Sequence, residues 1–275
     1  MPCHHPIPAW RNAAGTLTLR EPRSELPSAE YLRLPCGTCL GCRLSRAREW
    51  ALRCSLELSL HDHACWTTLT YDDAHLPPTL DKSHLSGFIK RLRARVEPAR
   101  IRFFASGEYG ERTARPHYHA ILYGVSDSPH IPAAWPFGFA RVDPLTPAAI
   151  AYVAGYCAKK VGWKLELGER VDPTTGEVYE YQPPFLLMSR NPGIAGAHRS
   201  TPSAWRRHAV YSGQLIPAPR YLHESWLNSA TTDDISKLKE EKALSATDST
   251  KARLQASAHI ALAKHNLSQA KRQKL

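Results

Sequence analysis

The sequence contains no apolar run long enough to cross a membrane. A spanning helix needs about 20 largely apolar residues, and no stretch of this chain reaches even about 18. The first eight residues, Met-Pro-Cys-His-His-Pro-Ile-Pro, also lack the apolar core of a secretory signal. We therefore expect a protein without a membrane span and without a secretory leader.

Acidic residues are scarce relative to basic ones. The 275 residues include 25 acidic side chains against 36 lysines and arginines, which gives a net charge of +11. Excess positive charge of this size favours a polyanionic partner. The hydrophobic fraction of 43% is ordinary for a folded protein, so the chain can also bury a full core.

The cysteines do not suggest a disulfide framework. There are seven of them, an odd number, and Cys36, Cys39 and Cys42 are tightly spaced. This pattern is typical of reduced thiols or metal ligands, and it indicates a cytoplasmic compartment.

Three thiolates spaced three residues apart can hold a structural zinc ion, which requires a fourth ligand. Cys3 is the first candidate for that ligand, and His4 and His5 are the alternatives. A reduced cluster without metal is the competing interpretation. An iron–sulfur site is disfavoured because neither a fourth nearby cysteine nor a redox role is evident.

Hydrophobic periodicity predicts both helices and strands. Helices are expected over residues 44–60, 83–96 and 146–162, strands over 65–71, 101–106 and 117–123, and a hairpin or loop insertion within 165–184. The expected parts are a Cys-rich segment with a basic helix (1–60), a core (61–165), its C-terminal continuation (166–227) and a polar, mobile tail (228–275).

Two histidines flank one tyrosine at the start of the third expected strand. Alternate side chains of a strand share a face, so His117 and His119 point the same way and can hold a divalent metal. Glu108, at the end of the neighbouring expected strand, is the first choice for a carboxylate ligand, and Glu111 and Asp72 compete with it. A His/His/carboxylate set suits a catalytic Mg²⁺ or Mn²⁺. A solvated turn residue is the plain alternative for Glu108.

Two tyrosines share one face of the third expected helix. Tyr152 and Tyr156 are four residues apart, and Lys159 continues their face. A tyrosine hydroxyl is a poor nucleophile unless a cation stabilises its phenolate or the transition-state charge. Core or surface packing is the alternative interpretation of this pair.

These segments together resemble a known family. Residues 65–71 end in Thr-Leu-Thr-Tyr, residues 115–119 read Arg-Pro-His-Tyr-His, and residues 152–160 carry two tyrosines and two lysines. In their order and spacing they are similar to the three motifs of HUH-type rolling-circle replication initiators, most closely those of gokushovirus-like microviruses, which are small single-stranded-DNA phages. Residues 35–43 resemble the cysteine cluster of these phage proteins.

The resemblance implies an α+β fold with a central antiparallel sheet flanked by helices, a split βαβ-like HUH core. It also implies an activity: a tyrosine nicks single-stranded DNA at the phage origin, forms a 5′-phosphotyrosine link and later rejoins strands. The implied setting is the cytoplasm of a bacterial host cell, with host replication proteins as partners. Tyr156 is expected to act first, with Lys159 one turn beyond it, and Tyr152 second.

Basic side chains near these motifs are candidates for phosphate contacts. They are Arg43, Arg91, Arg93, Arg115 and Lys160. Solvated helix faces are the plain alternative for several of them. Two other functions stay open at this point: a transposase or relaxase of the HUH type, and a zinc-stabilised protein that binds single-stranded DNA without catalysis.

Overall fold

The computed structural model describes residues 3–21, 29–110, 113–160, 169–171, 175–245 and 250–272. Side chains are described for these residues except 156–160, 170 and 268–272. The chain divides into two compact units. Unit 1 combines residues 1–46 with 239–275, and unit 2 comprises residues 47–238. Helix α1 (Leu40–Leu58) and helix α6 (Thr232–Leu244) each contribute residues to both units.

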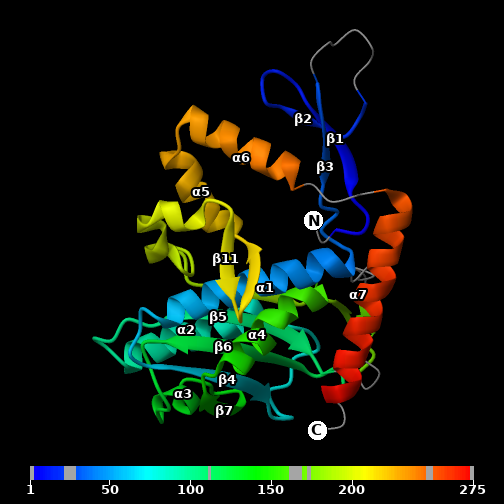
Figure 1. Cartoon of the computed structure of the whole chain (residues 1–275). Coiled ribbons are helices and arrows are strands. Elements are labelled where there is room, and N and C mark those ends of the chain that lie inside the picture. Colours follow the sequence, from blue (N-terminus) through cyan, green and yellow to red (C-terminus); the bar gives the residue numbers. More distant parts are fainter. Residues whose placement is uncertain are drawn as a thin grey trace. The chain divides into compact units, whose positions relative to one another are not determined.

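Unit 2 is built on a five-stranded antiparallel sheet (Figure 1). Its strands lie in the order β10, β5, β6, β4, β7, so the sequence neighbours β5 and β6 pair in the middle. The bounds are β4 Ala64–Tyr71, β5 Arg102–Tyr109, β6 Pro116–Tyr123, β7 Gly138–Pro144 and β10 Phe185–Met188. The expected strands of the core and the antiparallel pairing of β5 with β6 are confirmed.

Helices cover both faces of this sheet. Strand β4 alternates between half-buried and buried residues, as expected for a strand between two layers. On one face Leu69 and Tyr118 pack with α2 (Lys82–Arg95) and α3 (His130–Ala133). On the other face Ile121 and Tyr123 pack with α1 and α4 (Pro147–Lys160). The predicted α+β class with a helix-flanked antiparallel sheet is therefore confirmed.

Side-chain caps start two helices where the sequence predicted them. The Asp81 carboxylate accepts a hydrogen bond from the Ser83 N–H at 2.6 Å, and α2 follows. The Thr146 hydroxyl accepts one from the Ala149 N–H at 3.1 Å, and α4 begins at Pro147. Each cap satisfies an amide that has no partner within the helix. The predicted end of this helix, at Gly162, lies outside the described residues.

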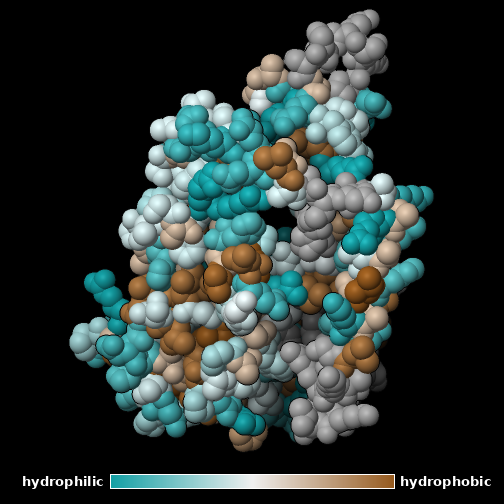
Figure 2. Space-filling view, in the orientation of Figure 1, coloured by the Kyte–Doolittle hydropathy of each residue, from teal (hydrophilic) through white to brown (hydrophobic). Residues whose placement is uncertain are grey.

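The C-terminal part of unit 2 adds elements around the sheet. The expected hairpin forms from β8 (Glu169–Val171) and β9 (Val178–Glu180). Strand β10 adds an edge to β5, which the sequence did not indicate. The remaining elements are η1 (Gly196–Ser200), η2 (Pro202–Trp205), the hairpin of β11 (His208–Tyr211) and β12 (Gln214–Pro217), and α5 (Arg220–Ser229). Figure 2 shows hydrophobic residues gathered on the visible face of unit 2, where Figure 1 draws α2, β5 and β6.

Unit 1 contains more regular structure than the sequence indicated. Residues 1–42 lack clear periodicity, yet they form a small antiparallel sheet of order β2, β1, β3. Its strands are β1 Ile7–Arg11, β2 Leu17–Thr18 and β3 Glu30–Leu34. The region expected to be a polar tail includes α6 and α7 (Lys251–Arg272), whose side chains are mostly exposed. Among the described residues, no helix combines the length and apolarity needed to cross a membrane.

Candidate functional site

Glu108, His117 and His119 come together on one face of the sheet. Glu108 lies opposite His117 in the pair of β5 and β6, and strand alternation puts His119 on the same face two residues later. Glu108 Oε1 lies 3.3 Å from His119 Nε2 and 3.8 Å from His117 Nε2. One ligand atom from each residue lies within 4.8 Å of the other two. The structure thus assembles the three residues that the sequence selected as metal ligands.

Hydrogen bonds at the opposite ring nitrogens orient both imidazoles. His117 Nδ1 lies 3.2 Å from the carbonyl oxygen of Arg115, and His119 Nδ1 lies 3.0 Å from the hydroxyl of Thr68 on β4. A carbonyl oxygen only accepts, so the hydrogen of a neutral His117 ring sits on Nδ1. The lone pair of His117 then remains on Nε2, the atom nearer Glu108. Contacts of this kind fix the orientation of metal-binding histidines.

The three side chains fit a divalent cation. Glu108 and His119 are only 8% and 5% exposed, and His117 is half-buried. A buried carboxylate requires a compensating positive charge, which neutral imidazoles do not supply and a bound cation would. Three protein ligands also leave further coordination positions open to a substrate. The competing Asp72 is instead bound to the ring of His75, at 2.8 Å, and Glu111 lies outside the described residues.

Tyr152 stands beside this triad. It lies on α4, whose Ile150, Val153 and Ala154 pack into the core on the same face of the sheet. The ring centroid of Tyr152 lies 5.7 Å from that of His119 and 5.9 Å from that of Trp66. Its side chain is 44% exposed, so a substrate can reach it. Tyr156, Lys159 and Lys160 continue the helix, but their side chains lie outside the described ones.

A groove of about 330 Å³ opens on the triad face of the sheet. It is lined by alternate residues of two adjacent strands, Trp66, Thr68 and Thr70 of β4 and Phe139, Arg141 and Asp143 of β7. Sequence analysis did not select the three residues of β7, and it did not single out Thr68 as a contact of His119. The available signal was the period of two in residues 139–143, which is weak without knowledge of the strand pairing.

The candidate DNA-binding arginines do not line this groove. Arg91 and Arg93 lie on α2, which packs on the opposite face of the sheet, and they donate to the carbonyl oxygens of Ala134 and Ile101. Arg115 forms an ion pair with Asp73 at 2.6 Å, and Arg43 belongs to unit 1.

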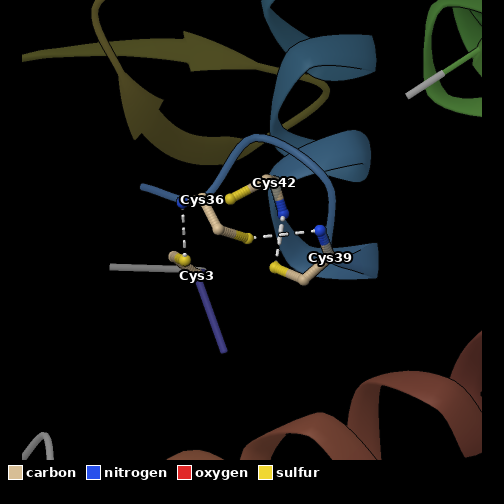
Figure 3. Close-up of side chains that lie close together, drawn as sticks. All are labelled: Cys3, Cys36, Cys39 and Cys42. Atoms are coloured by element: carbon tan, nitrogen blue, oxygen red, sulfur yellow. Dashed lines mark hydrogen bonds between the residues drawn. The ribbon is translucent and has the colours of Figure 1, made fainter. Parts of the chain in front are cut away.

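The cysteines of unit 1 form a second cluster (Figure 3). The Sγ atoms of Cys3, Cys36, Cys39 and Cys42 all lie within 4.8 Å of one another. Backbone N–H groups of Cys36, Cys39 and Cys42 donate to the sulfurs of Cys3, Cys36 and Cys39, at 3.3, 3.3 and 3.5 Å. The fourth sulfur therefore comes from Cys3, the first candidate from the sequence, while the His4 N–H donates to Cys39 Sγ at 3.4 Å.

Hydrogen bonds to sulfur favour the thiolate at Cys36. Burial raises the pKa of this thiol, but donors from Cys39 and Thr38 outweigh burial and lower the pKa to about 6. Burial raises the pKa of Cys42 well above its ordinary value. Four converging sulfurs with amide donors are a donor set that suits a soft cation such as zinc.

Comparisons with known proteins match the part of the chain that carries the triad. Residues 64–161 match the family model described as replication-associated protein ORF2/G2P. The chain is 34% identical to replication-associated protein ORF2 of Spiroplasma virus 4, over 48% of this chain and 49% of that protein. It is 31% identical to replication-associated protein VP4 of Bdellovibrio phage phiMH2K, over 58% of this chain and 59% of the relative.

A third relative is replication-associated protein ORF4 of Chlamydia phage 1, which is 32% identical over 46% of this chain and 38% of its own length. The chain spans about half the length of the curated relatives it matches. No solved structure gives a significant match. The resemblance to phage replication proteins that the ordered motifs predicted is confirmed by these matches.

Proposed function

We propose that this chain initiates rolling-circle replication of a small single-stranded-DNA phage by nicking and rejoining DNA through a tyrosine. One observation carries the proposal. The Glu108, His117 and His119 triad lies beside the exposed ring of Tyr152, within the residues that match replication-associated proteins. A metal-binding triad alone fits many functions, but a tyrosine at its edge supplies the nucleophile for phosphodiester cleavage.

The triad residues and the tyrosines divide the work. Glu108, His117 and His119 hold a Mg²⁺ or Mn²⁺ ion, which when bound polarises a scissile phosphate. A tyrosine oxygen attacks phosphorus, the bond to the 3′ oxygen breaks, and that oxygen takes up a proton to become a free 3′ hydroxyl. The 5′ side remains on the enzyme as a phosphotyrosine.

Strand rejoining reverses the same chemistry. A 3′ hydroxyl attacks the phosphorus of the phosphotyrosine, the bond from phosphorus to the tyrosine oxygen breaks as the new phosphodiester bond forms, and the tyrosine oxygen takes up the proton that the hydroxyl loses. We assign the first cut to Tyr156, because Lys159 follows it at the spacing of one turn and can face the phosphate. Tyr152 then cuts the regenerated origin. The setting we propose is the cytoplasm of the bacterial host, where host replication proteins extend the 3′ hydroxyl.

The four cysteines have a separate role in this proposal. Cys3, Cys36, Cys39 and Cys42 hold one structural zinc ion that joins the N-terminal segment to the start of α1. Four sulfur ligands would complete the coordination of a zinc ion and leave no position for a substrate, as is usual for a structural site.

The alternatives predict different products. A zinc-stabilised binder of single-stranded DNA would bind an oligonucleotide but form no covalent bond. A relaxase or transposase of the HUH type would form the bond, but transposases of this type use one tyrosine and relaxases tend to carry a third histidine in the metal motif. The two tyrosines and two histidines of this chain favour the replication initiator.

The decisive experiment incubates the protein with single-stranded DNA of its phage origin and Mn²⁺, and then maps the modified peptide by mass spectrometry. We expect a DNA adduct on Tyr152 or Tyr156 that chelator prevents. Glu108→Gln should abolish the adduct, whereas Glu224→Gln, which changes a partly exposed carboxylate paired with Arg220, serves as the matched control. Tight DNA binding with no adduct under any divalent metal would support the non-catalytic binder.

A further inference from the structure

The triad face of the sheet continues past the histidines into the groove. Two rows of side chains cross the strands β5, β6, β4 and β7 on this face: Glu108, His117, Thr70 and Phe139 form one row, and Ser106, His119, Thr68 and Arg141 form the next. Neighbouring strands lie about 4.8 Å apart, so the backbone of Phe139 stands about 10 Å from that of His117. A chain bound across this face therefore reaches both the triad and β7.

The β7 side of the groove exposes an aromatic ring and a cation. Phe139 is 70% exposed, although it is a large hydrophobic residue. Two strand positions on, the side chain of Arg141 is 78% exposed, and its guanidinium is held by Asp143 at 2.9 Å. One exposed apolar residue is common on a protein surface. Here the ring lines a groove together with an arginine, on the same face as a metal triad.

Single-stranded DNA is the occupant that this combination fits. Each unpaired base has an apolar π face that stacks on aromatic side chains, and each phosphate attracts a cation. Because every base has such a face, stacking does not depend on base identity. The net charge of +11 favours the same polyanion. The groove volume of about 330 Å³ lies within the usual range for sites that hold a small molecule or one unit of a polymer.

We propose that this groove binds the nucleotide next to the scissile phosphate, with Phe139 stacking on the base and Arg141 facing the phosphate. The proposal rests on the proposed nuclease function, because that function supplies the DNA and the reacting phosphate at the triad. It adds a binding residue, Phe139, that acts on affinity and not on the reacting atoms.

The test measures binding without added Mg²⁺ or Mn²⁺, so that cleavage does not contribute and the cysteine cluster is left undisturbed. Fluorescence anisotropy compares an oligothymidylate of about 16 nucleotides with an abasic phosphodiester of equal length. We expect Phe139→Leu to weaken oligothymidylate binding roughly tenfold and to leave abasic binding unchanged, because leucine lacks the π face. Phe139→Trp should restore the wild-type difference. Arg141→Gln should weaken both oligomers and reduce the salt dependence of binding.

The exposed Leu215→Ala on β12 is the matched control and should bind both oligomers as the wild type does. Equal binding of oligothymidylate by Phe139→Leu and wild type overturns the proposal, and so does equal loss of both oligomers. Tighter binding of oligouridylate than of oligothymidylate overturns the choice of DNA. If binding depends on Phe139 but no tyrosine adduct forms, the nuclease function alone is refuted. If the adduct forms but Phe139→Leu leaves binding unchanged, only the stacking site is refuted.

Discussion

At the scale of single residues, the triad depends on contacts from neighbouring positions. His117 is oriented by the carbonyl of Arg115, two residues earlier on the chain, and His119 by Thr68 on the adjacent strand. The side chain of Arg115 is in turn held by Asp73 and by the carbonyl oxygen of Tyr71. A residue that the sequence marked for DNA binding thus also fixes the start of the histidine strand.

His117→Ala and His119→Ala should each lower nicking by at least about 100-fold at saturating Mn²⁺. Removing even a residue that orients a metal ligand costs about 10- to 100-fold, and in the proposed site these residues are the ligands themselves. A gel assay of origin-DNA cleavage measures the rate, and circular dichroism checks the fold. His130→Ala, exposed on the opposite side of the sheet, is the control. Wild-type rates in either triad variant would remove the triad from the mechanism.

The two tyrosines give the second prediction at this scale. Tyr156→Phe should lose most of the initial adduct, and Tyr152→Phe should still nick but fail to circularise the strand. Both changes remove one oxygen and keep the ring, so the packing of Tyr152 against His119 and Trp66 is preserved. Adduct mapping measures the first cut, and a circle-formation assay measures the later strand joining. Loss of the first adduct in Tyr152→Phe alone would reverse the order, and an adduct in the double variant would exclude both tyrosines.

At the scale of elements, a buried ion network ties α1 to the sheet and to the segment before η1. The carboxylate of Glu57 on α1 bonds Arg102 on β5, accepts from the Ala195 N–H at 2.6 Å and contacts His61 at 3.2 Å. Arg102 also donates to the carbonyl oxygens of Pro192 and Gly193. Burial raises the pKa of Glu57, but hydrogen bonds from Arg102, Ala195 and His61 outweigh burial and lower the pKa below its ordinary value.

Glu57→Gln should lower the free energy of unfolding by about 3 kcal/mol at neutral pH, because it leaves Arg102 without its buried counter-charge. A lowered pKa means that the wild-type carboxylate adds stability above the unfolded pKa of about 4.3, and that this stability is lost as pH falls through the folded pKa. The difference between variant and wild type should therefore shrink in acid. Urea unfolding at several pH values measures it. Glu224→Gln, from a surface pair with Arg220, should change stability by less than about 0.5 kcal/mol.

Local sequence patterns predicted the elements that carry the triad. The neighbours of these elements in space depend on long-range strand pairing, which such patterns do not reveal. Side chains of a strand alternate between its two faces, and the residues of β6 can be recognised as a strand from the sequence alone. The shared face of His117 and His119 could therefore be predicted. Cys3 could be predicted because zinc requires a fourth ligand. Helical periodicity does not tell which face of a sheet a helix covers, so the position of Arg91 on the opposite face could not be foreseen. The role proposed for Phe139 and Arg141 depends on the pairing of β7 with β4, which the sequence alone does not reveal.

At the scale of the whole molecule, the two candidate metal centres belong to different units. The cysteine cluster lies in unit 1 and the triad in unit 2. Each centre draws its residues from segments of its own unit, and their chemistry differs, with four sulfurs in one and imidazole and carboxylate in the other. The two metals should therefore be separable by chelator strength and by mutation.

Freshly purified, reduced protein should contain one zinc per chain by elemental analysis. Stripping it with a strong chelator should increase proteolytic cleavage within residues 1–46, because the proposed zinc ion would join Cys3 to the segment of Cys36, Cys39 and Cys42. Cys39→Ser should behave like the stripped protein, while Cys54→Ala, which changes a buried thiol outside the cluster, should keep its zinc. Protein that is free of zinc yet equally resistant to protease would refute a structural ion.

The triad and the tyrosines lie on different kinds of element, the triad on strands in the middle of the sheet and the tyrosines on a helix that packs on its face. The proposed metal ligands belong to β5 and β6, which are hydrogen-bonded on both sides within the sheet, so their amides should be among the slowest to exchange with deuterium. The tyrosines lie on α4, and among the described side chains of this helix Ile150, Val153 and Ala154 pack against the sheet. The geometry of the triad is set by the pairing of β5 with β6 and not by this helix. In the proposed mechanism, a single cation held by the sheet would therefore serve both tyrosines of the helix, one after the other.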